Sequence, residues 1–103
     1  MKGDDSVDYT KEIDTMRHNL VHIRKTCGMS TTQFGGLIGV TRQTIYNIEC
    51  GRNRLTQTMY LAILYVMEKQ IYPTCSAAQR EMLERLLVDK VTECNYHESL
   101  SFN

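Results

Sequence analysis

No run of apolar residues in the 103-residue chain approaches the ~18 consecutive residues that a membrane-spanning helix needs. The opening segment MKGDDSVDYT also lacks the apolar stretch of a secretory signal peptide. We therefore expect a soluble, unprocessed cytoplasmic protein that makes no use of a membrane. The length leaves room for one compact domain and none for a second folded module.

Closely paired cysteines are missing as well. Cys27, Cys50, Cys75 and Cys94 lie too far apart in sequence to form the motif of a zinc ribbon, a redox site or a haem attachment. We expect reduced thiols, as is usual for a chain without a secretion signal. The chain has no glycine-rich phosphate loop, no nucleophile placed near a base by a motif, and no recognisable carboxylate pair. Catalysis, a bound metal and a cofactor are not expected.

One metal-site alternative involves His18, His22 and Cys27, which fall on nearly one face of a predicted helix. Further ligands are not evident, and histidines on a helix surface are common. The sequence favours ordinary surface residues, and stoichiometric zinc in the purified protein would reverse that interpretation.

The net charge is zero, which by itself argues against a nucleic-acid partner. The distribution of charge argues otherwise. Residues 1–14 carry a net charge of minus three, residues 15–55 plus five, and residues 56–103 minus two. In the middle segment Glu49 is the one acidic residue, and the basic residues are Arg17, Arg24, Lys25, Arg42, Arg52 and Arg54.

Start and stop signals predict an all-α fold of about five short helices, because alternation of apolar and polar residues never persists. The first helix should end at Gly28. Its apolar stripe, at spacings of three and four, is Ile13, Met16, Leu20, Ile23 and Cys27.

Ser30 and Gln33 form a capping box that predicts a second helix from Thr31 to Gly39. Its buried face is expected to contain Phe34, Leu37 and Ile38.

A third helix should follow after about three residues. Thr41 is suited to cap it, Ile45 and Ile48 should point inward, and Gly51 should mark its end.

Thr56 can cap a fourth helix that is apolar on two faces and should therefore be buried on more than one side. One face contains Met59, Ala62, Ile63 and Val66, and the other contains Tyr60, Leu64, Met67 and Ile71.

Pro73 should end that region, and Ser76 with Gln79 forms a second capping box. The apolar stripe of the fifth helix is Met82, Leu83, Leu86, Leu87 and Val91. The predicted organisation is a flexible acidic arm over 1–12, a helix-turn-helix domain over 13–72, a C-terminal helix over 73–94 that packs on the domain or dimerises, and a polar tail over 95–103.

Several positions at fixed spacing carry a resemblance over about a third of the chain, from Leu20 to Thr56. They are Arg24, the Gly28-Met29-Ser30 turn, Gly35, the IGVTRQTI turn, and Glu49 with Gly51. Together they resemble the phage-repressor and Cro type of helix-turn-helix family, the xenobiotic-response-element-like regulators. The resemblance implies a lambda-repressor-like DNA-binding domain with an added C-terminal helix.

The resemblance places Arg42, Gln43 and Asn47 where side chains meet base edges. Arginine can donate two hydrogen bonds to guanine, and glutamine or asparagine can pair bidentately with adenine. These residues lie opposite Ile45 and Ile48 on the predicted helix. The alternative is that they form only the solvated side of an amphipathic helix.

The resemblance also implies contacts with the DNA backbone. The family often has glutamine at the position of Thr31 and asparagine at the position of Cys50, so this chain departs from the pattern at both. Arg24 and Glu49 resemble a structural pair that ties the first helix to the end of the recognition helix. The expected backbone contacts are Thr31, Thr41, Thr44, Tyr46, Arg52, Asn53 and Arg54.

The last two helices have more apolar residues than one small core needs, which predicts a symmetric homodimer on a palindromic double-stranded DNA operator. Alternatively, these two helices merely cover each other. Repression is favoured over activation. The rival function is an antitoxin-like or other module that binds a partner protein through its C-terminal helices. The dimer-interface candidates are Tyr60, Leu64, Met67, Ile71, Leu83, Leu86 and Leu87.

Overall fold

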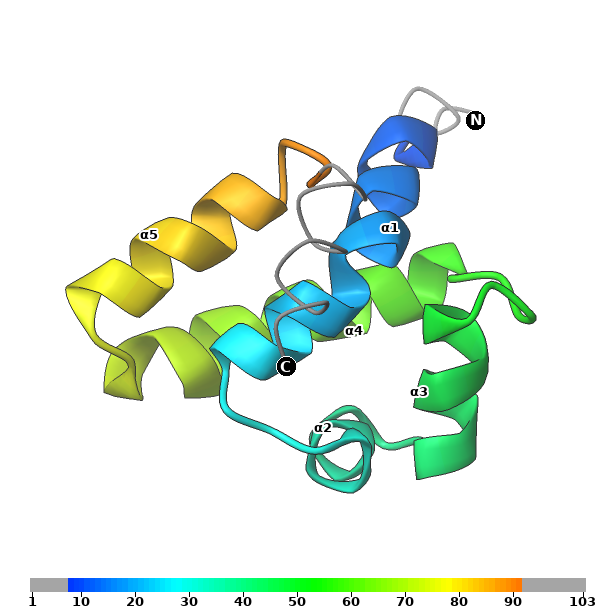
Figure 1. The fold of residues 1–103 in the computed structure, drawn as a ribbon, viewed down its shortest axis with the longest axis horizontal. Coiled ribbons are helices and arrows are strands. Elements are labelled where there is room, and N and C mark those ends of the chain that lie inside the picture. The colour runs from blue at the N-terminus through cyan, green and yellow to red at the C-terminus, as the bar shows by residue number, and fades with distance from the viewer. Residues whose placement is uncertain (1–7, 92–103) are drawn as a thin grey trace, which may run out of the picture.

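The computed structural model describes residues 8–91, and every regular element in that range is helical. The predicted all-α class with five α-helices is confirmed. In Figure 1, α2 and α3 lie together below α1 and α4, while α5 lies at the opposite side of the molecule. The helices are α1 (Thr10–Thr26), α2 (Thr31–Ile38), α3 (Arg42–Glu49), α4 (Gln57–Val66) and α5 (Ala77–Leu86).

The predicted N-terminal caps of α2 to α5 are confirmed. In α2 the Ser30 hydroxyl accepts from the amide of Gln33 at 3.1 Å, and the Gln33 side chain accepts from the amide of Ser30 at 2.9 Å. The same reciprocal box begins α5, and single threonine caps begin α3 and α4. Each cap accepts a hydrogen bond from a backbone amide that has no partner within the helix, so local residues determine where α2 to α5 begin.

The first helix begins earlier than predicted. Residues 10–12, which were assigned to the flexible arm, form the first turn of α1. The carboxylate of Asp8 accepts from the Thr10 amide at 3.0 Å and from its hydroxyl at 2.6 Å, and these hydrogen bonds lower the pKa of Asp8. The rest of the predicted acidic arm, the tail over 95–103 and Cys94 lie outside the described residues.

One core joins all five helices. In the described range no helix is long and apolar enough to cross a membrane. The buried apolar residues are Met16, Leu20, Ile23, Phe34, Ile45, Ile48, Leu55, Tyr60, Ile63, Val66, Met67, Ile71, Leu83 and Leu86.

This core corrects the predicted dimer interface. Tyr60, Met67, Leu83 and Leu86 were expected to face a second chain, but they are only 7%, 1%, 0% and 3% exposed in a single chain. The cause is that α4 packs against both α1 and α2, while α5 packs on α1, so the apolar faces of α4 and α5 are buried within one chain. The remaining candidates also contact the core of their own chain: Ile71 is buried, and Leu64 and Leu87 are half-buried against it.

Between α4 and α5 the chain turns through a π-helical segment, Met67–Ile71, and a 3-10 turn, Tyr72–Thr74. The predicted stop at Pro73 falls within that 3-10 turn. Arg80 then lies over the Tyr72 ring, with 4.6 Å from its guanidinium carbon to the ring centroid.

The segment after α5 is held to α1 by a buried asparagine that no sequence pattern singles out. Asn19, fully buried, donates to the carbonyls of Leu86 and Asp89 at 2.7 Å each and accepts from the amide of Val91 at 3.0 Å. Nε2 of His18 also contacts the Val91 carbonyl oxygen, at 2.9 Å. These bonds fix the C-terminal end of the described fold.

Candidate nucleic-acid interface

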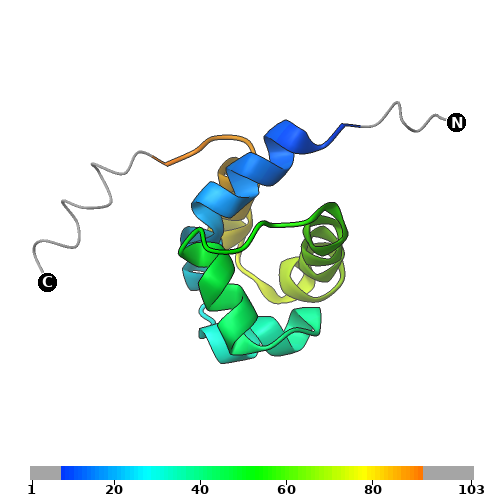
Figure 2. The ribbon, with the colours of Figure 1, turned by 90° about the vertical axis from the view of Figure 1, so that its right-hand side faces the viewer.

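Helices α2 and α3 are joined by a three-residue turn whose geometry depends on two glycines. Gly39 ends α2 in the left-handed region, with φ of 97°. The carbonyl of Gly35 accepts from the amides of both Gly39 and Val40, at 2.8 Å each. A β-carbon at position 35 would lie only 2.7 Å from the Val40 carbonyl oxygen, so a larger residue would push the turn away. Figure 2 shows α2 and α3 at the lower edge of the molecule.

Helix α3 is divided sharply between an inner and an outer face. Ile45 and Ile48 are 0% and 1% exposed, as predicted from the sequence. Arg42 and Gln43 are exposed and Asn47 is half-exposed. The structure therefore brings the three predicted base-reading side chains to the solvent side of one two-turn helix that is anchored from behind.

Two of these side chains are joined directly. The Gln43 amide nitrogen, Nε2, donates to Oδ1 of Asn47 at 3.1 Å. This bond leaves the Gln43 oxygen as an acceptor and the Asn47 nitrogen as a donor toward solvent. The sequence prediction missed the bond, although two amide residues four apart on an exposed helical face are a signal for it.

Two threonines at the start of α3 already make hydrogen bonds within the helix. The Thr41 hydroxyl accepts from the amide of Thr44 at 3.2 Å, and the two hydroxyl oxygens are 3.0 Å apart. Thr31 is the first residue of α2 and is half-buried.

The loop after α3 presents Arg52, Asn53 and Arg54, all exposed. The amides of Arg52 and Asn53 donate to the carbonyl of Asn47 at 2.8 and 3.2 Å, which holds the loop against α3. Within residues 8–91, none of Arg42, Arg52 and Arg54 forms an ion pair. Their positive charge is therefore not neutralised by an acidic neighbour of the described chain.

Tyr46 projects from the same side of α3 and is 47% exposed. A hydrogen bond with Cys50, one turn later, is the main cause that raises the pKa of Tyr46. The phenol accordingly keeps its proton at neutral pH, in the form that can donate to an anionic oxygen.

The predicted structural pair is formed. Nε of Arg24 donates to Oε2 of Glu49 at 2.6 Å, and Nη2 of Arg24 donates to Oε1 of Glu49 at 3.2 Å. A third guanidinium bond, 3.0 Å long, reaches the carbonyl of Met29 before α2. The side chains of the pair are only 13% and 6% exposed. One arginine on α1 therefore fixes both the entry to α2 and the end of α3.

The alternative metal site at His18, His22 and Cys27 receives no support from the described residues. No group of three His, Cys, Asp or Glu side chains able to hold a metal ion occurs in the described part of the chain.

No family model, curated protein or solved structure matches this chain.

Proposed function

We propose that this chain is a sequence-specific DNA-binding transcription regulator that inserts α3 into the major groove. The observation that carries the proposal is the outer face of α3, where Arg42, Gln43 and Asn47 gather on a helix with a fully buried back. A short exposed helix beside a tight glycine turn fits the ~12 Å width of the groove.

The chemistry of the face suits base edges. The Arg42 guanidinium can make a bidentate contact with guanine O6 and N7. The bonded Gln43 and Asn47 side chains offer one acceptor and one donor at a fixed spacing, which complements N6 and N7 of adenine. We expect Arg42 to select a G·C pair and the amide pair to select a neighbouring A·T pair.

Phosphate contacts would come from the flanks of α3. Arg52 and Arg54 have no acidic partner among residues 8–91, and Arg54 lies two residues before the N-cap of α4. The unsatisfied amides at that helix start favour an anionic oxygen. Such contacts position the protein on DNA without reading sequence.

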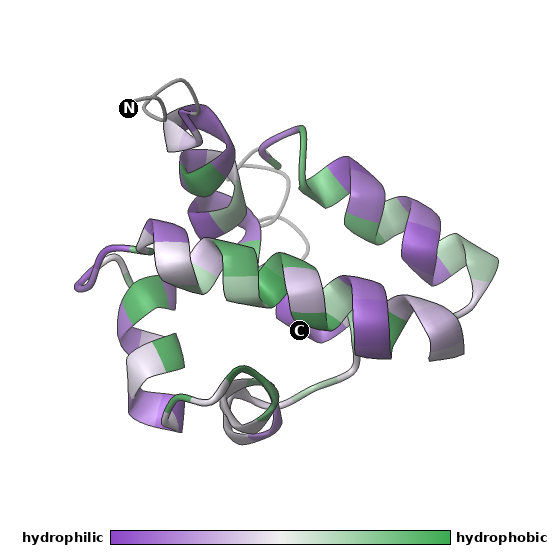
Figure 3. Ribbon diagram, turned by 180° about the vertical axis from the view of Figure 1, so that it is seen from behind, coloured by the Kyte–Doolittle hydropathy of each residue, from purple (hydrophilic) through white to green (hydrophobic). Residues whose placement is uncertain are grey.

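We further propose that the regulator acts as a homodimer on a palindrome and represses by occupying an operator. The buried residues of α4 and α5 are excluded from that interface, so the contact must use apolar side chains that stay exposed. Leu61 and Tyr65, one turn apart on α4, are 41% and 63% exposed, and Met82 on α5 is 43% exposed. Figure 3, seen from behind, shows α4 crossing the front of the molecule with much hydrophobic colour. Two recognition helices ~34 Å apart would then read both half-sites.

Selection of bound duplexes from a random DNA pool tests the central claim. A regulator of this kind enriches a palindrome, whereas a module that works only by binding a protein partner through the exposed α4 surface enriches nothing. Absence of any enriched sequence would refute the proposal in favour of that rival.

Three arginine variants then separate the roles. Arg42→Ala should weaken binding to the selected site by ~1–3 kcal/mol and leave binding to random DNA nearly unchanged. Arg54→Ala should weaken both and reduce the salt dependence of binding by about one phosphate contact. Arg85→Ala, which removes the same charge from exposed α5, is the matched control and should change neither. An equal loss on all DNA for Arg42→Ala would rule out direct readout.

A further inference from the structure

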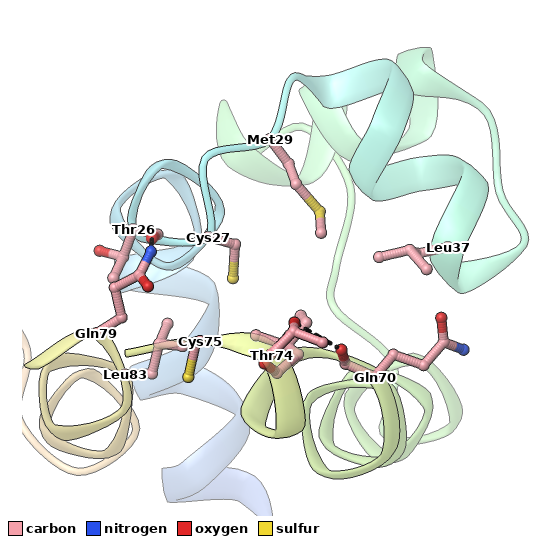
Figure 4. Close-up of a pocket in the computed structure, with 10 residues that line it drawn as sticks. Thr26, Cys27, Met29, Leu37, Gln70, Thr74, Cys75, Gln79 and Leu83 are labelled. Carbon is pink, nitrogen blue, oxygen red and sulfur yellow. Dashed lines mark hydrogen bonds between the residues drawn. The ribbon is translucent and has the colours of Figure 1, made fainter. Parts of the chain in front are cut away.

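We propose that Cys27, Met29 and Cys75 form a binding site for a thiophilic metal ion of the Cu(I) class. These three sulfur-bearing side chains line one pocket of about 270 Å³, and no residue of α3 lines it. Figure 4 shows them around the same hollow, together with Thr26, Leu37 and Leu83. The inference is independent of the proposed DNA binding.

The sulfurs come from two junctions that are distant in sequence and adjacent in space. Cys27 is the C-terminal cap of α1, and Met29 follows in the loop before α2. Cys75 ends the 3-10 turn and directly precedes Ser76, the N-cap of α5. The side chain of Gln79 donates to the carbonyl of Thr26 at 3.1 Å, which holds the two junctions together.

The lining of the pocket selects a soft ion. It contains no carboxylate, histidine or charged side chain, so a hard cation such as Mg²⁺ or Ca²⁺ finds no suitable set of ligands. Thiolate and thioether ligands are those that Cu(I) prefers. Methionine has three rotatable side-chain bonds, so Met29 can adjust its sulfur to an ion held by the two cysteines.

The two cysteines would hold the ion as thiolates. On binding, each ligating thiol forms a sulfur–copper bond and releases its proton to solvent, with no change of oxidation state.

An ion at this place would link the α1–α2 junction to the start of α5. Because the ligands are 48 residues apart in sequence, binding to the folded form alone should raise the melting temperature.

The test uses the full chain with Cys50 and Cys94 replaced by serine, reduced and kept under anaerobic conditions. Cu(I) is supplied as its bicinchoninate complex, and transfer to the protein is followed by the loss of colour. We expect one ion per chain for this parent, loss of transfer in Cys27→Ser and Cys75→Ser, and at least about tenfold weaker retention in Met29→Leu. Cys27→Ala provides a second variant where serine at the half-buried site perturbs folding, and helical circular dichroism checks each protein.

Two outcomes would overturn the site. The first is a parent protein that takes no Cu(I), or a variant lacking Cys27 or Cys75 that takes it as well as the parent. The second is a loss of titratable thiols after the metal is removed, which would show that the cysteines had formed a disulfide. DNA selection on the same metal-free parent reports separately on the proposed function.

Discussion

Replacing Glu49 with glutamine should destabilise the fold far more than an ordinary surface substitution. The change keeps the shape of the side chain and removes its charge, so the Arg24 guanidinium loses its ionic partner. Arg24 is 13% exposed and keeps its 3.0 Å bond to the Met29 carbonyl, while the new amide offers it one neutral oxygen in place of two charged ones. A guanidinium left in that position is poorly solvated and cannot give up its proton.

The expected cost follows from the burial of the pair. Breaking a fully buried ion pair by removing one partner costs about 3–5 kcal/mol. Because Arg24 keeps some exposure and one hydrogen bond, we expect a loss of about 2–3 kcal/mol. For a domain of this size, that corresponds to a fall in melting temperature of roughly 10–20 °C. DNA binding should fall as well, since the pair fixes the end of α3.

Urea denaturation of the wild type and of Glu49→Gln, followed by helical circular dichroism, measures the effect. The matched control is Glu84→Gln, which breaks the 3.2 Å ion pair between Glu84 and Arg80. The side chains of Arg80 and Glu84 are 53% and 55% exposed. That exposed pair should contribute less than about 0.5 kcal/mol. A Glu49→Gln protein as stable as Glu84→Gln would refute the argument that the Arg24 pair holds α3 in place.

Three further substitutions test other parts of the fold. Asn19→Ala removes three hydrogen bonds to the end of α5 and the segment after it, and should lower the free energy of unfolding by about 2–4 kcal/mol. The largest increase in amide hydrogen exchange should occur over residues 86–91, and unchanged protection there would contradict the role of Asn19 in holding this segment. Gly35→Ala should lower stability by about 1–3 kcal/mol in thermal melting, because the added carbon would lie 2.7 Å from the Val40 carbonyl oxygen. Gly36→Ala is the control and should be neutral or slightly stabilising, because no atom lies within 4 Å of its added carbon. Equal effects of the two substitutions would show that the turn can move to accept a larger residue at position 35. The pKa of Cys27 is raised from 9.0 to about 11, so the unfolded chain ionises first and stability should fall as pH rises above 9.0. Screening at this half-buried thiol keeps the loss below about 1 kcal/mol by roughly pH 10, and metal-free Cys27→Ala should lose less over the same range; parallel pH profiles would exclude the thiol as the cause.

The starts of α2 to α5 could be predicted because each is set by residues at most three apart. Ser30 with Gln33 and Thr41 with Thr44 act through local hydrogen bonds that need no knowledge of the rest of the fold. The orientation of α3 followed from helical period in the same way, since Ile45 and Ile48 define its inner face.

What could not be predicted depends on contacts across long stretches of chain. The apolar faces of α4 and α5 are visible in the sequence, but periodicity does not say whether their cover is α1 or a second molecule. Tyr60 and Leu83 were assigned to the wrong partner for that reason. Asn19 was missed because its partners are backbone groups 67 to 72 residues away, and a lone asparagine in a helix carries no local sign of them.

The hydrogen bonds of Asn19 also bear on the order in which the protein folds. Helices α2 and α3 meet across three residues, so their contact requires little loop closure and can form early. The contact between α1 and the segment after α5 closes a loop of 72 residues and must wait until the intervening helices are ordered. We therefore expect α5 to dock last and to open first. During synthesis, a chain that has emerged only through α4 already contains the whole α2–α3 unit, while Asn19 still has water in place of its final partners.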